Sequence, residues 1–138
     1  MYLEHLNLVV KDLQKSLCFY QAAMPHWQVR GGGESVWHGA KRNWIHFGDD
    51  YHYLSLNDSG TGVNRELVSN DIGLGHFAYV VNDLDALVAR LKDAGFEVRI
   101  WGGNQPNAKS VYFIDPDGYE VEFVQYLSDI PSERNQYL

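Results

Sequence analysis

The stretch DPDGYEVEF, from Asp115 to Phe123, joins a turn to a strand. Its first half is turn chemistry, because Pro116 fixes its own φ and Gly118 adopts a positive φ at no steric cost. Its second half alternates acidic and apolar side chains, which is typical of a strand with one wet face and one dry face. Two interpretations of Glu122 remain open at this point: a solvated strand residue, or a carboxylate that faces a positive charge.

The strand ends the second copy of an internal repeat. Residues 3–30 resemble residues 74–99, and His5 matches His76 at an offset of 71 residues (76 − 5). The ends of the two copies align at an offset of 67 residues, which pairs Ser55 with Glu122 (122 − 55). A repeat of this length indicates a duplicated supersecondary unit and not a solenoid of short repeats.

Each copy reads as a strand, a helix and further strands. An aspartate, Asp12 or Asp83, precedes an apolar pattern of helical period and predicts an N-cap. Gly95 is a good residue to end the second helix. Short strands are predicted in the remainder, at WQVR, VWHG, NWIHFG and YLSLN in the first copy and at FEVRIW, SVYFID and YEVEFVQ in the second. The predicted fold is therefore α+β, with two tandem βαβββ modules.

The modules have clear boundaries in the sequence. We expect the first module at residues 1–56, a linker at 57–73 and the second module at 74–126. Residues 127–138 form a polar C-terminal tail, in which a short helix can start at Pro131. The loop at residues 102–109 is polar, and we interpret it as a lid.

The composition excludes several classes of protein. A chain of 138 residues with 45% hydrophobic residues can bury a core. A formal net charge of −7 without a basic run argues against nucleic acid and against an anionic membrane surface as partners. No apolar stretch is long enough to span a bilayer, and the N-terminal stretch is unlike a signal peptide. A single cysteine, Cys18, excludes an intrachain disulfide framework, so we expect a cytoplasmic protein with Cys18 in the core.

The repeat places His5, His76, Ser55 and Glu122 at equivalent positions on the first and last strands of the modules. Two imidazoles and one carboxylate can hold one side of a metal ion and leave the other side open for water and substrate. Taken singly, each histidine is more often a hydrogen-bonded structural residue. Their matched positions are what favours a metal site.

The stretches HLNLVVKDLQKSLCFY, GHFAYVVNDLDALVARLKDAGFEV and SVYFIDPDGYEVEFVQ together resemble the vicinal oxygen chelate superfamily. That group includes glyoxalase I, bleomycin-resistance proteins, fosfomycin-resistance enzymes and extradiol dioxygenases. The resemblance implies modules whose mixed sheets curl into an open cup, with the helices outside. It also implies one divalent metal ion bound by His5, His76 and Glu122. Imidazole and carboxylate ligands suit Fe, Mn, Zn, Ni and Co alike, so the metal identity stays open.

The resemblance further implies a homodimer, in which His5 of one chain can join His76 and Glu122 of either chain. Glyoxalase I carries a glutamate where this chain has Ser55, and a serine is neither a good metal ligand nor a general base at neutral pH. We therefore expect a metal-dependent enzyme for a small oxygen-bearing substrate, of the dioxygenase or fosfomycin thiol transferase kind, and not a standard lactoylglutathione lyase. The alternative is a metal-free protein that sequesters a small molecule, as bleomycin-resistance proteins do.

Other residues stay open at this stage. Arg30 and Arg99 match across the repeat and either bind an anionic substrate or are surface charges. A dioxygenase would need a further histidine near the metal, for which His38, His46 and His52 are candidates. Glu120 shares the face of Glu122 and is interpreted as a solvated residue or as a partner of the ligands.

Overall fold

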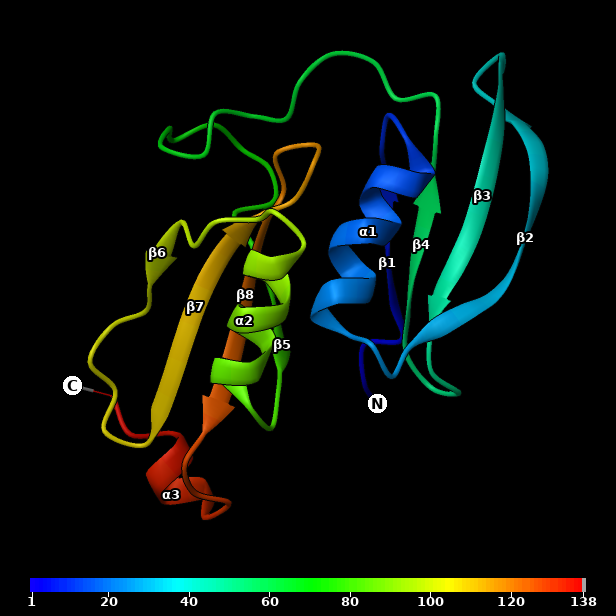
Figure 1. The fold of residues 1–138 in the computed structure, drawn as a ribbon. Helices are drawn as coiled ribbons and strands as arrows, with labels where there is room; N and C mark the ends of the chain where they lie inside the picture. Colours follow the sequence, from blue (N-terminus) through cyan, green and yellow to red (C-terminus); the bar gives the residue numbers. More distant parts are fainter. Residues whose placement is uncertain (138) are drawn as a thin grey trace. The chain divides into compact units, whose positions relative to one another are not determined.

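The structure is a computed structural model that describes residues 1–137. These residues divide into two compact units, and the boundary in the chain lies between Val63 and Asn64. Each unit contains one βαβββ module, so the predicted fold class is confirmed (Figure 1). The short predicted C-terminal helix is present as well. The two units are described separately below.

Unit 1 folds into one mixed sheet of four strands. Its elements are β1 (His5–Val9), α1 (Leu13–Ala23), β2 (Gln28–Trp37), β3 (Ala40–Gly48) and β4 (Tyr53–Asn57). The strand order is β1-β4-β3-β2, in which β1 and β4 are parallel and the other neighbours are antiparallel.

Unit 2 repeats this topology. Its elements are β5 (Phe77–Val80), α2 (Leu84–Asp93), β6 (Ile100–Trp101), β7 (Ala108–Ile114), β8 (Glu120–Tyr126) and α3 (Pro131–Arg134). The strand order is β5-β8-β7-β6, again with a parallel first pair and antiparallel neighbours. The strand β8, which contains EVEF of the stretch DPDGYEVEF, thus lies between β5 and β7 inside its sheet.

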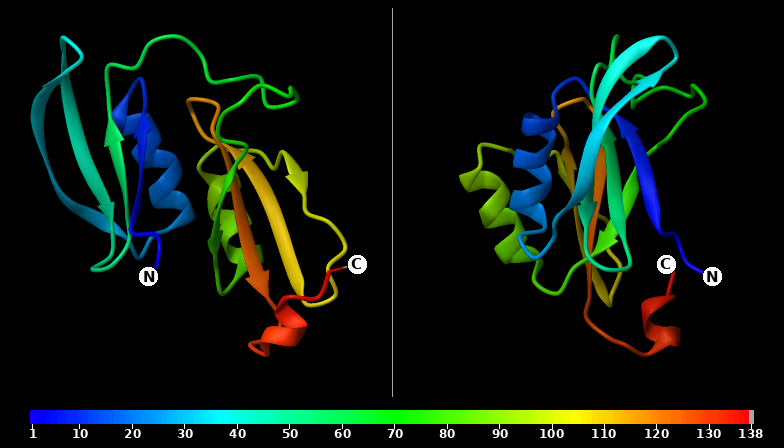
Figure 2. Two further views of the ribbon diagram at one scale, coloured as in Figure 1. Left: turned by 180° about the vertical axis from the view of Figure 1, so that it is seen from behind. Right: turned by 90° about the vertical axis from the view of Figure 1, so that its right-hand side faces the viewer.

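Each helix covers one face of its own sheet (Figure 2). The predicted N-caps are confirmed, because the Asp12 carboxylate accepts hydrogen bonds from the backbone N–H groups of Gln14 and Lys15, and Asp83 accepts one from Ala86. Apolar side chains under the helices are almost fully buried: Leu8, Phe47, Leu54 and Leu56 in unit 1, and Leu87, Leu91, Val111, Phe113, Val121 and Phe123 in unit 2. Because strand side chains alternate, the next residues on each strand point to the far face, which is the face away from the helix.

The DPDG turn has the geometry that its residues predict. The buried carboxylate of Asp115 accepts hydrogen bonds from the backbone N–H groups of Asp117 and Tyr119, each at 2.9 Å. Gly118 has a φ of 90°, which strongly favours glycine. The Asn64 amide donates a hydrogen bond to the Gly118 carbonyl oxygen at 2.9 Å. This turn reverses the chain between β7 and β8 and places Glu122 on the far face.

Two strand predictions are corrected by the structure. WQVR and VWHG are not separate strands, because QVR of the first and VW of the second belong to the ten-residue strand β2, whose register with β3 shifts between Val29 and Gly31. In the second copy, only the last two residues of FEVRIW form a strand. Close approach explains Gly32 of β2, since a Cβ there would lie 2.6 Å from the backbone oxygen of Trp44, whereas nothing lies within 4 Å of a Cβ on Gly31.

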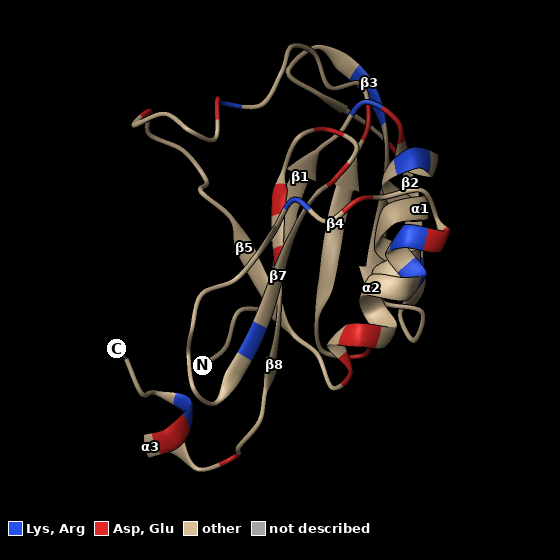
Figure 3. Ribbon diagram, turned by 60° about the vertical axis from the view of Figure 1, so that its left-hand side comes forward, with Lys and Arg blue, Asp and Glu red and all other residues tan. Residues whose placement is uncertain are grey.

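The prediction that Cys18 lies in the core is wrong, because Cys18 is exposed. Helix α1 buries Ser16, Leu17, Phe19, Tyr20 and Ala23, and Cys18 points away from that stripe. Acidic and basic residues are interspersed over the helices and loops (Figure 3). Within residues 1–137, no helix combines the length and the apolar character that crossing a membrane requires.

Candidate active site

The structure brings two of the three predicted ligands together on the far face of unit 2. His76 immediately precedes β5, and parallel pairing of β5 with β8 sets Ala78 opposite Glu122. The His76 Nε2 atom lies 3.2 Å from a carboxylate oxygen of Glu122. Its other ring nitrogen, Nδ1, lies 3.9 Å from Glu120. The His76 side chain is 43% exposed and that of Glu122 is 15% exposed, so the pair is open to solvent from the histidine side.

This spacing fits a shared metal ion. Two ligand atoms that each lie about 2.1 Å from one ion, at roughly a right angle, are about 3 Å apart. The 3.2 Å between His76 and Glu122 is close to that value, and a neutral imidazole with a carboxylate is a donor set that many divalent transition metals accept. Among the described residues of each unit there is no group of three His, Cys, Asp or Glu side chains that could hold a metal ion. The third predicted ligand, His5, belongs to unit 1.

Tyr112 holds Glu122 in place. Antiparallel pairing of β7 with β8 sets Tyr112 opposite Glu122, and the Tyr112 hydroxyl is hydrogen-bonded to that carboxylate. Burial, followed by this hydrogen bond and by the negative charge of Glu122 and Glu120, raises the pKa of Tyr112 to about 12. The phenol is therefore a permanent donor at neutral pH. The ring also packs edge-on against His76, with 5.3 Å between ring centroids.

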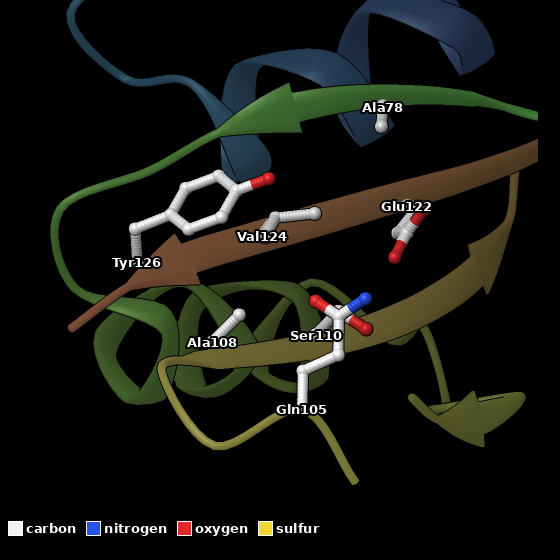
Figure 4. Close-up of a pocket in the computed structure, with 7 residues that line it drawn as sticks. All are labelled: Ala78, Gln105, Ala108, Ser110, Glu122, Val124 and Tyr126. Atoms are coloured by element: carbon white, nitrogen blue, oxygen red, sulfur yellow. The ribbon is translucent and has the colours of Figure 1, made fainter. Parts of the chain in front are cut away.

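A pocket of about 270 Å³ begins at Glu122 and runs along the far face of unit 2 (Figure 4). The amide of Gln105 and the hydroxyls of Ser110 and Tyr126 are its neutral polar groups. The apolar lining is provided by Ala78, Ala108 and Val124, and Glu122 is the charged residue among those that line it. The pocket therefore suits a small molecule with hydrogen-bonding groups and a short apolar part.

The far face of unit 1 carries an aromatic row around His5. The His5 ring stacks on Tyr53 with 4.6 Å between centroids, and His46 lies against the same tyrosine at 4.4 Å. The His5 Nδ1 atom is 2.9 Å from the Glu4 carboxylate. A histidine whose Nδ1 is bound by a carboxylate presents Nε2 to a metal, an arrangement that raises the basicity of the ligand.

Ser55 occupies the place in unit 1 that Glu122 has in unit 2. It is buried on β4, opposite Asn7 of β1 and His46 of β3. Burial, and then the positive charge of Arg30 and of His5, lowers the pKa of His46. Among the three extra histidines that a dioxygenase could use, His46 is the one beside the Ser55 position, whereas His38 lies in the hairpin turn after β2 and His52 lies near Asp49.

The matched arginines have different partners. The Arg99 guanidinium forms an ion pair with Glu120. The Arg30 guanidinium lies over the ring of Tyr53, 4.6 Å from its centroid. Glu120 thus contacts both Arg99 and, more loosely, the predicted ligand His76, so it is not a purely solvated residue.

Tyr112 and the pocket-lining residues Gln105, Ser110 and Tyr126 were not predicted from the sequence. Alternation in SVYFI offers a signal for Ser110 and Tyr112, because Val111 and Phe113 are the buried residues between and after them. For Gln105 and Tyr126 the sequence has no comparable signal, since a loop residue and a strand end meet only through the fold.

Comparisons with known proteins agree with the geometry. Residues 2–123 match the model of the Glyoxalase/Bleomycin resistance protein/Dioxygenase superfamily. The chain is 32% identical to the glutathione transferase FosA from Serratia marcescens over 127 residues, which cover 87% of this chain and 77% of FosA. It is 28% identical to the metallothiol transferase FosB from Lysinibacillus sphaericus strain C3-41 over 128 residues, which cover 88% and 79% of the two chains.

A solved structure with the same fold is a variant of the fosfomycin resistance protein FosX from Listeria monocytogenes, complexed with Mn(II) and 1S,2S-dihydroxypropylphosphonic acid. The TM-score is 0.71 at 18% identity, and the match covers 97% of this chain and 98% of FosX. The predicted kinship with thiol transferases is confirmed by the two sequence relatives, and it supports an enzyme of the vicinal oxygen chelate type. This chain belongs to the Glyoxalase/Bleomycin resistance protein/Dioxygenase superfamily.

Proposed function

We propose that this protein is a divalent-metal-dependent thiol transferase that opens a small, strained oxygen-bearing substrate such as the epoxide fosfomycin. The observation that carries the proposal is the pairing of His76 with Glu122 at 3.2 Å, in a chain 32% identical to a glutathione transferase. We assign His5, His76 and Glu122 as the metal ligands. Mn(II) is the first metal to test because FosX has been seen with it.

The proposed reaction balances without an external oxidant. The thiolate sulfur attacks one epoxide carbon, a C–S bond forms and the C–O bond to that carbon breaks. The oxygen leaves as an alkoxide and takes up one proton. A bound divalent metal would act as a Lewis acid that stabilises the developing charge on this oxygen.

The residues of the chain supply the surroundings of that step. Tyr112 donates its hydroxyl hydrogen to Glu122 and keeps the carboxylate oriented. The neutral lining of the pocket, which includes Gln105 and Ser110, offers hydrogen bonds to substrate hydroxyl or ether oxygens (Figure 4). Ser55 supplies no carboxylate at the place equivalent to Glu122, so the glutamate that moves the substrate proton in glyoxalase I has no counterpart there, which agrees with nucleophilic opening by an external thiol.

We further propose that the protein is a cytoplasmic homodimer. The single exposed cysteine suits a reducing compartment, and family members commonly build the metal site from modules of two chains. Light scattering at several protein concentrations tests the dimer directly.

The decisive experiment loads the purified protein with Mn(II) and follows thiol consumption with fosfomycin and either glutathione or cysteine. Mass spectrometry should find an adduct with the summed mass of thiol and epoxide. Parallel assays use Fe(II) with catechol for a dioxygenase and Ni(II) with the methylglyoxal–glutathione adduct for a lyase. Failure to bind any divalent metal, together with tight binding of a small molecule, would establish the metal-free binding protein instead.

A further inference from the structure

The two matched arginines of the repeat differ in whether their charge is neutralised. Arg30 and Tyr53 in unit 1 correspond to Arg99 and Glu120 in unit 2, the second pair at the offset of 67 residues (120 − 53). Glu120 forms an ion pair with Arg99, whereas Tyr53 receives Arg30 on its ring face. Within the part of the chain that the structure describes, no carboxylate lies within 4.0 Å of the Arg30 guanidinium. Arg30 therefore has no carboxylate partner there, and it is exposed.

A β-bulge presents this charge to the far face of unit 1. Val29 pairs with Phe47 and Gly31 pairs with His46, so Arg30 is the extra residue in the ladder between β2 and β3. Bulges often redirect a side chain next to a functional site. Here the redirected side chain lies over Tyr53, on the face that also carries His5.

The Tyr53 ring beneath the guanidinium belongs to a row of flat rings. The rings of Trp44, His46, Tyr53 and His5 follow one another with centroid separations of 4.9, 4.4 and 4.6 Å. Stacking on Tyr53 orders the planar guanidinium and leaves its N–H groups available at the edge, where they match the two oxygens of a carboxylate or phosphonate. The pocket of unit 2 has no Lys or Arg among the residues that line it, so it offers no such partner for an anion.

We propose that Arg30, held on Tyr53, is the anion-binding residue of this protein and receives the oxyanion of a small organic acid, with the aromatic row beside it taking a flat or apolar substituent. The inference rests on the proposed function only in assigning that acid to the enzyme's substrates. The oxyanion can belong to the phosphonate of the acceptor or to a carboxylate of the thiol, and the two sources share the same chemistry.

Binding can be measured without metal and without turnover. Phenylphosphonate, an anion with a flat ring, is titrated into metal-free protein while tryptophan fluorescence reports on the row that contains Trp44. Wild-type protein should bind it and should bind the uncharged benzyl alcohol far more weakly. Arg30→Ala should weaken phenylphosphonate binding by roughly 10-fold to 100-fold, the range expected for a lost charged hydrogen bond.

Two control variants distinguish anion binding by the Arg30 guanidinium from a general effect of surface charge. Lys41→Ala removes the same charge from the surface of unit 1, where Lys41 pairs with Glu34, and should leave the affinity unchanged. Arg30→Lys keeps the charge but loses the two-pronged donor, so it should recover only part of the affinity. Equal weakening by Lys41→Ala, an unchanged affinity in Arg30→Ala, or no binding to wild-type protein would each overturn the proposal.

Kinetics then assign the source of the oxyanion and distinguish this inference from the proposed function. If the acceptor supplies the oxyanion, Arg30→Ala raises the KM for fosfomycin and leaves the KM for glutathione unchanged. If the thiol supplies the oxyanion, Arg30→Ala raises the KM for glutathione and leaves the KM for fosfomycin unchanged. In that second case the KM for uncharged 2-mercaptoethanol is the same in the variant and in wild type. Arg30-dependent binding of phenylphosphonate without any thiol transfer would refute the proposed function alone. Thiol transfer with both KM values unchanged in Arg30→Ala would refute the role of Arg30 alone.

Discussion

The Nε2 atom of His76 lies 3.2 Å from a carboxylate oxygen of Glu122, although the two residues are 46 positions apart in the chain (122 − 76). The distance results from parallel pairing of β5 and β8, the first and last strands of one module. The distance is that of an ion pair, and it is also compatible with two ligands of one ion.

Glu122→Gln should remove most of the metal affinity, because the amide cannot supply the negative charge of the carboxylate. We expect a loss of more than 10-fold in Mn(II) affinity, larger than the effect of removing a residue that only supports a ligand. Isothermal titration with Mn(II) measures it. The matched control is Glu120→Gln, on the same face of the same strand, which should lose clearly less affinity because Glu120 pairs with Arg99 and lies 3.9 Å from His76. Equal losses in the two variants would exclude Glu122 as a specific ligand.

Tyr112→Phe should weaken Mn(II) binding by about 10-fold, since Glu122 loses the hydrogen bond that orients it. The same variant should change the stability at alkaline pH. The pKa of Tyr112 is raised to about 12, above its ordinary value of 10.0, so its contribution to stability is complete below pH 10 and is lost as the pH rises to about 12. Urea unfolding across that range should show a shallower decline for Tyr112→Phe than for wild type. Tyr79, whose pKa is also raised by burial, remains in both proteins and serves as an internal reference.

Ser55→Glu should restore the carboxylate that glyoxalase I has at this place. Ser55 is 7% exposed, so a charged side chain there loses hydration, and we expect the free energy of unfolding without metal to fall by about 1–3 kcal/mol. Mn(II) should recover part of this loss if the new carboxylate reaches the ion. Thermal unfolding with and without Mn(II) measures both effects, and an equal loss in the two conditions would show that position 55 does not face the metal.

Mixing His5→Ala with Glu122→Gln should reveal whether two chains share a site. Each variant alone lacks one ligand and should be inactive. If His5 serves the partner chain, the mixed dimer regains one intact site, and random exchange of subunits yields about a quarter of the wild-type activity. If every site lies within one chain, the mixture stays inactive. Mixed unfolding and refolding, followed by thiol-transfer assays, distinguishes the two arrangements.

Asp115→Ala should destabilise the turn before β8. Asp115 is 4% exposed and accepts two backbone hydrogen bonds, so its removal leaves the N–H groups of Asp117 and Tyr119 without that partner. We expect a loss of about 1–3 kcal/mol in the free energy of unfolding, measured by urea denaturation. Asp49→Ala is the comparison, because Asp49 accepts similar bonds from Tyr51 and His52 in a more exposed turn and should cost less. An equal or larger cost at Asp49 would contradict the role of burial.

The repeat made most of the fold predictable. Asp12 and Asp83 marked the helix starts, and Pro116 with Gly118 marked the turn, because local backbone chemistry decides these features. The predictions failed where distant segments decide the outcome. The length of β2 depends on close packing of Gly32 against Trp44, and the exposure of Cys18 depends on which side of α1 meets the sheet.

The sequence alone predicted the duplication, the α+β class and the candidate ligands His5, His76 and Glu122. These features follow from the spacing of the repeat and from the local alternation of polar and apolar residues. Only the tertiary structure decided which side chains meet. Strand register set Tyr112 opposite Glu122, and a single bulge turned Arg30 onto Tyr53 while its counterpart Arg99 was neutralised by Glu120. Register and bulges arise from the packing of whole sheets, so no short stretch of the chain contains them.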